Sequence, residues 1–227
     1  MITLISVLTF TVFASLYPLF LWLVSSHGVS PGFHRFSLGL SSVVAGMAAA
    51  LLWLMETGIH IRLSAAVWLI SLMAVTWFFW NRSRVLAWVA SVPSVLGLIV
   101  YGEVLTEVIG MNLSWWGVWV LAGTVLCGAV FSMVLGHWYL NVADLPLGLF
   151  RRSVRWLVLV LAVRAVWDGF ALAGGEVQLG GQTVELANFI RSFDGFFLFF
   201  ALLVLGFIAN KFFFLGPSFP WQRALSL

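Results

Sequence analysis

The chain has 227 residues, of which 63% are hydrophobic and only 8% are charged, and its mean hydropathy is +1.10. Soluble domains are about 45–50% apolar and about 25% charged, so this composition excludes a soluble globular protein and a disordered one. A multi-span membrane protein is the class that remains. The net charge of +3 is small and comes from short loops, which indicates membrane orientation and no nucleic-acid partner.

Seven apolar segments, separated by short polar breaks, are long enough to cross about 30 Å of hydrocarbon. Their continuous apolar character excludes barrel strands and leaves helices, since only helices or closed barrels satisfy the backbone in lipid. We therefore expect an all-α protein with a single seven-helix transmembrane domain over residues 1–227. The predicted spans are 2–24, 38–55, 63–80, 85–109, 115–140, 153–175 and 188–215.

Basic residues predict which end of this bundle faces the cytoplasm, because cytoplasmic loops carry an excess of Lys and Arg. One side of the predicted bundle has only Arg62 and Arg191. The opposite side has Arg35, Arg82, Arg84, Arg151, Arg152, Arg155, Lys211 and Arg223. This asymmetry places the N-terminus outside and the C-terminus in the cytoplasm, and it is typical of a bacterial cytoplasmic (inner) membrane protein.

Local patterns predict a hairpin and two close helix contacts. Residues 174–187 contain EVQL and QTVEL on either side of Gly-Gly, an alternation typical of a short β-hairpin, here on the outside between the sixth and seventh helices. Small residues recur every four positions on two spans, a spacing that lets helix backbones approach. These stripes are Ser42, Gly46 and Ala50, and Thr124, Gly128, Ser132 and Gly136.

Four charged residues in the last two spans are candidates for a polar site, because an ionisable group in lipid is costly unless it is paired or wetted. Arg164 and Asp168 lie four apart on the sixth predicted span, and Arg191 and Asp194 lie three apart on the seventh. If the two helices are neighbours, Arg191 meets Asp168 and Arg164 meets Asp194 at a depth of roughly 10 Å. Either a structural staple or an outward-facing site for a substrate, a quinone head group or protons fits this pattern.

Two further groups lie toward the same outer side. Glu103 and Glu107 are four apart late in the fourth span, so they share a helix face. Like charges on one face raise each other's pKa, which proton-handling sites use. The alternative is a solvated helix end near the loop. Glu56 and His60, also four apart, form a secondary outer pair.

Histidines near the cytoplasmic side are candidate ligands of a b-type haem, which needs axial ligands at similar depth. His137 with His34, or with His27, is the combination that depth allows. The alternative is that these are interfacial histidines that hydrogen-bond or meet lipid head groups. No metal-binding motif is expected, since the chain has one cysteine, Cys127.

These features lead to three hypotheses of function. The first is a membrane subunit of a larger electron-transfer complex of respiratory or photosynthetic type, not catalytic on its own and in contact with quinone or haem. Its partners are membrane lipids and other membrane-protein subunits. The second is a small transporter or channel with an outward-facing polar site, and the third is a structural or assembly factor without a ligand.

Overall fold

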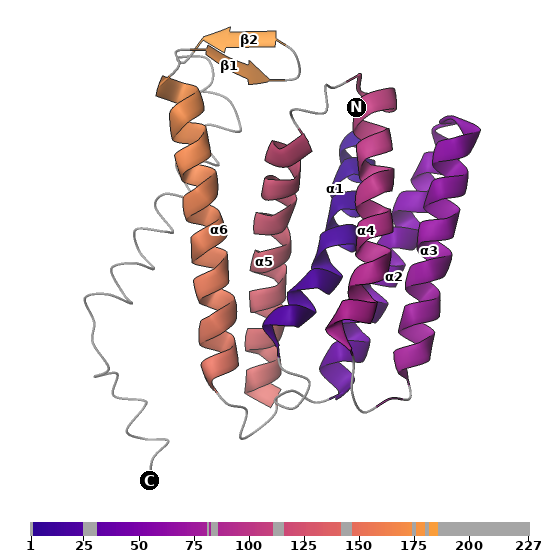
Figure 1. The fold of residues 1–227 in the computed structure, drawn as a ribbon, viewed down its shortest axis with the longest axis vertical. Coiled ribbons are helices and arrows are strands. Elements are labelled where there is room, and N and C mark those ends of the chain that lie inside the picture. Colours follow the sequence, from indigo (N-terminus) through magenta and orange to yellow (C-terminus); the bar gives the residue numbers. More distant parts are fainter. Residues whose placement is uncertain are drawn as a thin grey trace. The chain divides into compact units, whose positions relative to one another are not determined.

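The structure, a computed structural model, describes residues 2–24, 31–80, 82, 86–110, 116–141, 147–173, 176–179 and 182–185. The chain divides into two compact units, Met1–Leu157 and Val158–Leu227. The helices are α1 (Ile2–Leu16), α2 (Pro31–Leu54), α3 (Ile59–Trp80), α4 (Ala87–Glu103), α5 (Trp116–Asn141) and α6 (Leu147–Ala173) (Figure 1). A 3₁₀ segment, η1 (Tyr17–Leu23), continues α1, and a π-helical segment, η2 (Val104–Val108), continues α4.

Five of these helical segments are long and apolar enough to cross a membrane, namely 2–23, 31–54, 59–80, 87–108 and 116–139. They confirm a multi-pass helical membrane protein and coincide with the first five predicted spans. α2 and α3 begin seven and four residues earlier than predicted, because a helix continues beyond the apolar run that reveals it. α6 includes the predicted sixth span up to residue 173, whereas 188–215 lies outside the described residues. Seven spans and their orientation therefore stay predictions.

The first four helices form a closed ring in which each packs against the next: α1 on α2, α2 on α3, α3 on α4 and α4 back on α1. α5 packs on the outside of this ring, against α1 and η1. Of the most apolar 18-residue stretch of each span, 67% is buried in the first span but only 22% in α3. α1 is thus the central helix of the first unit, and most of α3 lies on the outside of the ring.

Small and polar residues allow α1 to occupy this central place. The hydroxyls of Thr11 and Ser15 donate to the carbonyls four residues earlier, at 2.7 and 2.6 Å, so neither polar group is left unsatisfied in the core. Pro18 has no N–H to donate to the carbonyl of Ala14, and the helix tightens to 3₁₀ from Tyr17 onward. The first span is therefore helical throughout but changes its winding near the cytoplasmic end that the sequence predicts.

The closest helix crossings occur at two glycines outside the predicted stripes. A Cβ on Gly97 of α4 would overlap Ser15 Oγ of α1 and lie 2.6 Å from Trp68 Nε1 of α3. A Cβ on Gly123 of α5 would overlap Val12 Cγ2 of α1. By contrast, a Cβ on Gly46 would meet nothing within 4 Å.

The buried stripe of α2 accordingly differs from the predicted one. It runs through Ser41, Ala45 and Ala49, one residue before the expected Ser42, Gly46 and Ala50. A shift of one residue turns a helix position by about 100°, and small residues occupy both faces of α2, so spacing alone could not select the packed one. On α5 the predicted stripe does pack: Cβ atoms on Gly128 and Gly136 would lie 3.2 Å from Leu157 and 3.3 Å from Phe150.

Two short strands follow α6 in the second unit. β1 (Glu176–Leu179) and β2 (Gln182–Glu185) pair antiparallel, with Glu176 opposite Glu185 and Leu179 opposite Gln182 (Figure 1). They fall within residues 174–187, where the alternating pattern indicates a hairpin. The side of the membrane that this pair faces stays a prediction.

A first prediction concerns two serines of the core. Ser94 Oγ is buried and has no hydrogen-bond partner among the described residues, whereas Ser42 Oγ bonds Thr76 Oγ1 of α3 at 2.8 Å. Since an unsatisfied buried hydroxyl costs about 1–3 kcal/mol, we expect Ser94→Ala to keep or raise the free energy of unfolding. Ser42→Ala should lower it by about 0.6 kcal/mol, the usual value of an interhelical hydrogen bond in lipid. Thermal unfolding in detergent compares the two, and a destabilised Ser94→Ala would contradict the expectation.

Candidate functional site

A group of polar residues of the first unit lies where α3 begins and α4 ends. α4 changes there into the π-helical segment η2, a form that is rare and frequent at functional sites. The Thr106 hydroxyl lies within hydrogen-bond distance of the carbonyls of Gly102, at 2.9 Å, and Glu103, at 3.3 Å, and shares its one proton between them. Gly110 follows η2 by two residues, and its φ of +72° favours glycine.

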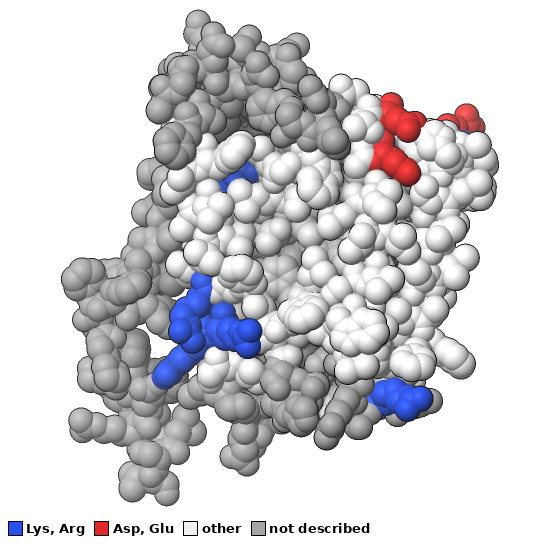
Figure 2. All heavy atoms as spheres, viewed as in Figure 1, with Lys and Arg blue, Asp and Glu red and all other residues white. Residues whose placement is uncertain are grey.

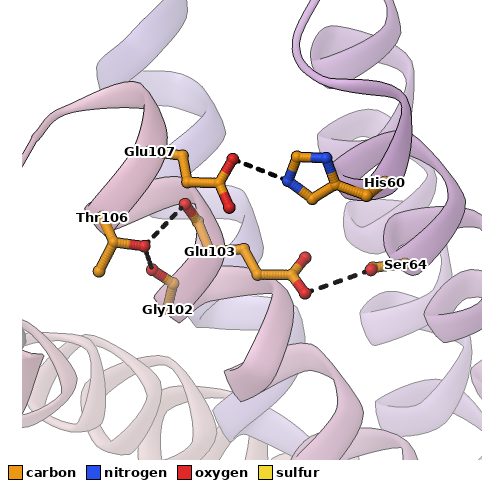
Figure 3. A network of polar contacts seen from close by, with 6 residues as sticks. All are labelled: His60, Ser64, Gly102, Glu103, Thr106 and Glu107. Carbon is orange, nitrogen blue, oxygen red and sulfur yellow. Dashed lines mark hydrogen bonds and ion pairs between the residues drawn. The ribbon is translucent and has the colours of Figure 1, made fainter.

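Two carboxylates face α3 here: that of Glu103, the last residue of α4, and that of Glu107 in η2 (Figure 3). His60 Nε2 and Glu107 Oε2 are 2.7 Å apart, and Ser64 Oγ donates to Glu103 Oε1 at 3.3 Å. Both partners on α3 are four residues apart, as are both glutamates, and α3 and α4 run antiparallel. Residues four apart share a helix face, so the two pairs form successive rungs between the helices.

The two rungs differ in exposure. The side chains of His60 and Glu107 are 55% and 49% exposed, so this rung forms the wet end of the site. Glu103 is only half-buried as a residue, but its Oε2 is inaccessible and has no hydrogen-bond partner in the described part of the chain. A carboxylate oxygen without a partner is unfavourable, so Glu103 has an unused acceptor, which a ligand can reach only after the side chain turns.

A hollow of about 450 Å³ lies beside Glu103. Its lining is mostly apolar and comprises Val95, Leu98, Ile99, Gly102, Glu103, Thr106 and Trp116. Trp116, at the start of α5, lies over Gly102, where a Cβ would be 3.7 Å from the indole Nε1. The missing side chain at Gly102 therefore leaves room between α4 and this indole.

A second prediction concerns the outer rung. Ion pairs at this level of exposure contribute about 0.2–1 kcal/mol, so a double-mutant cycle on His60→Ala and Glu107→Ala should give a coupling energy in that range. The free energy of unfolding is measured for the wild type, the two single variants and the double variant by thermal or chemical unfolding in detergent. A coupling well above 1 kcal/mol would show that this rung is a structural staple.

The expected Glu56–His60 pair is not the one that the structure shows. α2 ends at Leu54, and Glu56 lies exposed in the following turn with φ of 52°. His60 begins the next helix and bonds Glu107 instead. A spacing of four residues predicts a shared face only within one helix, and here a turn interrupts it.

Of the four charges expected between the last two spans, Arg164 lies on α6. Asp168 lies one turn further along the same helix, but its side chain is outside the described part, as are Arg191 and Asp194. The crossed ion pairs therefore stay a prediction.

The two candidate haem ligands lie in different surroundings. His34 of α2 is 3% exposed and meets the Phe33 ring edge-on at 6.1 Å, whereas His137 of α5 is exposed. His27, the alternative ligand, lies outside the described residues. A haem between these helices stays a prediction, and within the described ranges no group of three His, Cys, Asp or Glu could hold a metal ion.

Sequence reasoning missed Ser64, Gly102 and Trp116 as parts of the site. Ser64 carries a usable signal, since it lies four residues after His60 as Glu107 lies four after Glu103. No protein-family model matches the chain, and no curated protein or solved structure is significantly similar to it.

Proposed function

We propose that the chain is an integral membrane subunit of a larger electron-transfer complex that holds the head group of a quinone or hydroquinone in the hollow between Glu103 and Trp116. The observation that carries this proposal is an apolar hollow lined in part by Glu103, whose carboxylate has one oxygen without a hydrogen-bond partner among the described residues. Sites for small amphiphilic ligands have this composition: mostly apolar walls and a few polar groups that fix orientation.

Glu103 orients the ligand in this proposal. An ionised carboxylate accepts hydrogen bonds only, and a hydroquinone hydroxyl is a donor. Rotation of the glutamate carboxylate about its χ3 torsion costs little energy. One carboxylate oxygen can therefore turn toward the hollow while the other keeps its hydrogen bond from Ser64. The ring then packs against Val95, Ile99 and the Trp116 indole.

In this proposal the oxidation of hydroquinone releases protons to side chains of this chain and electrons to a partner subunit. Oxidation of a hydroquinone to the quinone releases two protons and two electrons. Protons pass from Glu103 toward Glu107 and His60, whose half-exposed side chains meet water. Electrons pass to a redox centre in a partner subunit, so the chain contributes a binding site and a proton exit to a reaction completed elsewhere.

Charge segregation supports an orientation with the site outside. Red carboxylates lie at one end of the visible face and blue arginines gather toward the other, in Figure 2. In the first unit Glu56, Glu103 and Glu107 share their end with Arg62, while the opposite end has Arg35, Arg82, Arg151, Arg152 and Arg155. By the positive-inside rule, we place the N-terminus outside, the C-terminus in the cytoplasm and the protein in a bacterial cytoplasmic membrane.

The test is a binding titration in nanodiscs of neutral lipid. A short-chain hydroquinone analogue should quench tryptophan fluorescence, and Trp116→Phe should remove most of that quenching. Gly102→Leu fills the hollow and should weaken binding at least tenfold. Gly46→Leu, made where a Cβ meets nothing within 4 Å, is the matched control and should bind normally. A wild-type chain that binds no quinone analogue, or an unaffected Gly102→Leu, would overturn the proposal.

A second candidate function, a small transporter, is favoured by the interrupted winding of two spans. α1 passes into 3₁₀ at Tyr17 and α4 into a π-helix at Val104, and transporters place binding sites at irregular helices. Proteoliposomes distinguish the two functions: a proton or cation flux that Glu103→Gln abolishes would favour transport. Quinone binding without flux would favour the electron-transfer subunit.

A further inference from the structure

A cluster of arginines at the start of α6 lies at the opposite end of the first unit from the candidate site. Arg151, Arg152 and Arg155 fall within five residues and are all exposed, and Figure 2 shows blue atoms gathered toward this end. None of the three forms an ion pair with any described residue. Among the described residues their one polar contact is internal: Arg155 Nε donates to the carbonyl of Arg151 at 3.3 Å.

This arrangement is unfavourable for the helix by itself. Arg151 and Arg155 are like charges four residues apart, which repel across one helical turn. Positive charge near a helix N-terminus also opposes the helix dipole. The cluster therefore gains more from an external anion than isolated arginines do.

The other described arginines at this end are less available. The Arg82 guanidinium lies over the Phe78 ring at 5.3 Å, and Arg35 has its Nε buried. Arg82 is exposed as well, but it stands alone, so the three arginines of α6 form the exposed cluster of cations at this end, within the part of the chain that the structure describes.

The start of α6 is held in place at the end of α5. The Tyr139 and Phe150 rings are 5.7 Å apart, a Cβ on Gly136 would lie 3.3 Å from Phe150, and Ser153 is 2% exposed. Trp156, beside Arg155, is 42% exposed, and tryptophan is enriched at the interfaces between membrane and water. We therefore expect the cationic cluster to lie at the level of the lipid head groups.

We propose that Arg151, Arg152 and Arg155 bind the head group of an anionic glycerophospholipid, with Trp156 against its glycerol and upper acyl region. Guanidinium groups bind phosphate oxygens in bidentate pairs, and basic clusters at a span end are the sequence feature of anionic-lipid binding. The adjoining indole favours a membrane lipid over a soluble phosphate, because it supplies an apolar contact that inorganic phosphate does not use.

The experiment compares lipid retention by native mass spectrometry after exchange into detergent containing equal amounts of phosphatidylglycerol and phosphatidylcholine. The wild-type chain should retain phosphatidylglycerol at least tenfold over phosphatidylcholine. The triple variant R151Q/R152Q/R155Q should lose this preference, and Arg82→Gln, which removes one charge at the same end, should keep most of it.

Two further measurements keep the outcome clear. Thermal unfolding in phosphatidylcholine nanodiscs tests whether the triple variant folds, and phosphatidylglycerol nanodiscs should raise the unfolding temperature of the wild type only. An equal rise with millimolar inorganic phosphate in neutral nanodiscs would assign the cluster to a soluble anion and overturn the proposal. A folded triple variant that retains phosphatidylglycerol as the wild type does would also overturn it.

Discussion

Gly97→Ala should lower the free energy of unfolding by about 1–3 kcal/mol, the usual cost of overpacking a filled core. The added Cβ would overlap Ser15 Oγ and lie 2.6 Å from Trp68 Nε1. Trp68 is fully buried, and Ser15 Oγ is held by its bond to the Thr11 carbonyl, so neither neighbour can move without cost. The expected result is separation of α1, α3 and α4 at their common crossing.

The matched control is Gly46→Ala, another mid-helix change in a span. A Cβ at Gly46 meets nothing within 4 Å, and alanine favours a helix over glycine by about 1 kcal/mol, so this variant should be as stable as the wild type or more stable. Unfolding temperatures in one detergent compare the two. Equal stability of the two variants would mean that α4 does not approach α1 and α3 as closely as the structure indicates.

Gly97 also illustrates what the sequence could and could not predict of the fold. Apolar run length indicates spans well, because lipid demands about 20 apolar residues in a helix, and the first five predicted spans are helices. Which face of a helix is packed depends on its neighbouring helices, and the sequence of one span does not identify those neighbours. Hence Gly97 and Gly123 were missed, and Ser42, Gly46 and Ala50 were assigned the closely packed face of α2 that Ser41, Ala45 and Ala49 occupy.

For the candidate site too, local spacing was predictable from the sequence and contacts between helices were not. Glu103 and Glu107 were expected to share a face because four-residue spacing is a local property, and the structure brings both toward α3. The partner of His60 is 47 positions away in the chain, and no local pattern predicts such a contact. The π-helical winding of η2 also has no sequence signal comparable to a proline, since Val104–Val108 reads as an ordinary apolar helix end with one glutamate.

Glu103→Gln should raise the stability of the chain and weaken its binding of hydroquinone, a pair of opposite effects that a purely structural residue would not give. Glutamine keeps a carbonyl oxygen for the Ser64 hydroxyl, now at Oε1, and removes the charge from a position where one oxygen has no partner among the described residues. Since a partly buried, unsatisfied carboxylate is unfavourable by roughly 1–3 kcal/mol, we expect the unfolding temperature to rise.

Binding should fall because a hydrogen bond to a charged acceptor contributes about 1.5–3 kcal/mol, or roughly 10- to 100-fold in affinity. Glu107→Gln is the matched control: it also replaces a glutamate of this face, but at a half-exposed position, so it should change both stability and affinity little.

Titration with the hydroquinone analogue and thermal unfolding are measured on the same preparations. Loss of stability in Glu103→Gln would identify the carboxylate as a structural partner of Ser64, whereas a stabilised variant with normal affinity would place the ligand elsewhere. Proteins retain destabilising groups where function requires them, and the opposite shifts of stability and affinity at one residue are the specific signature of such a group at Glu103.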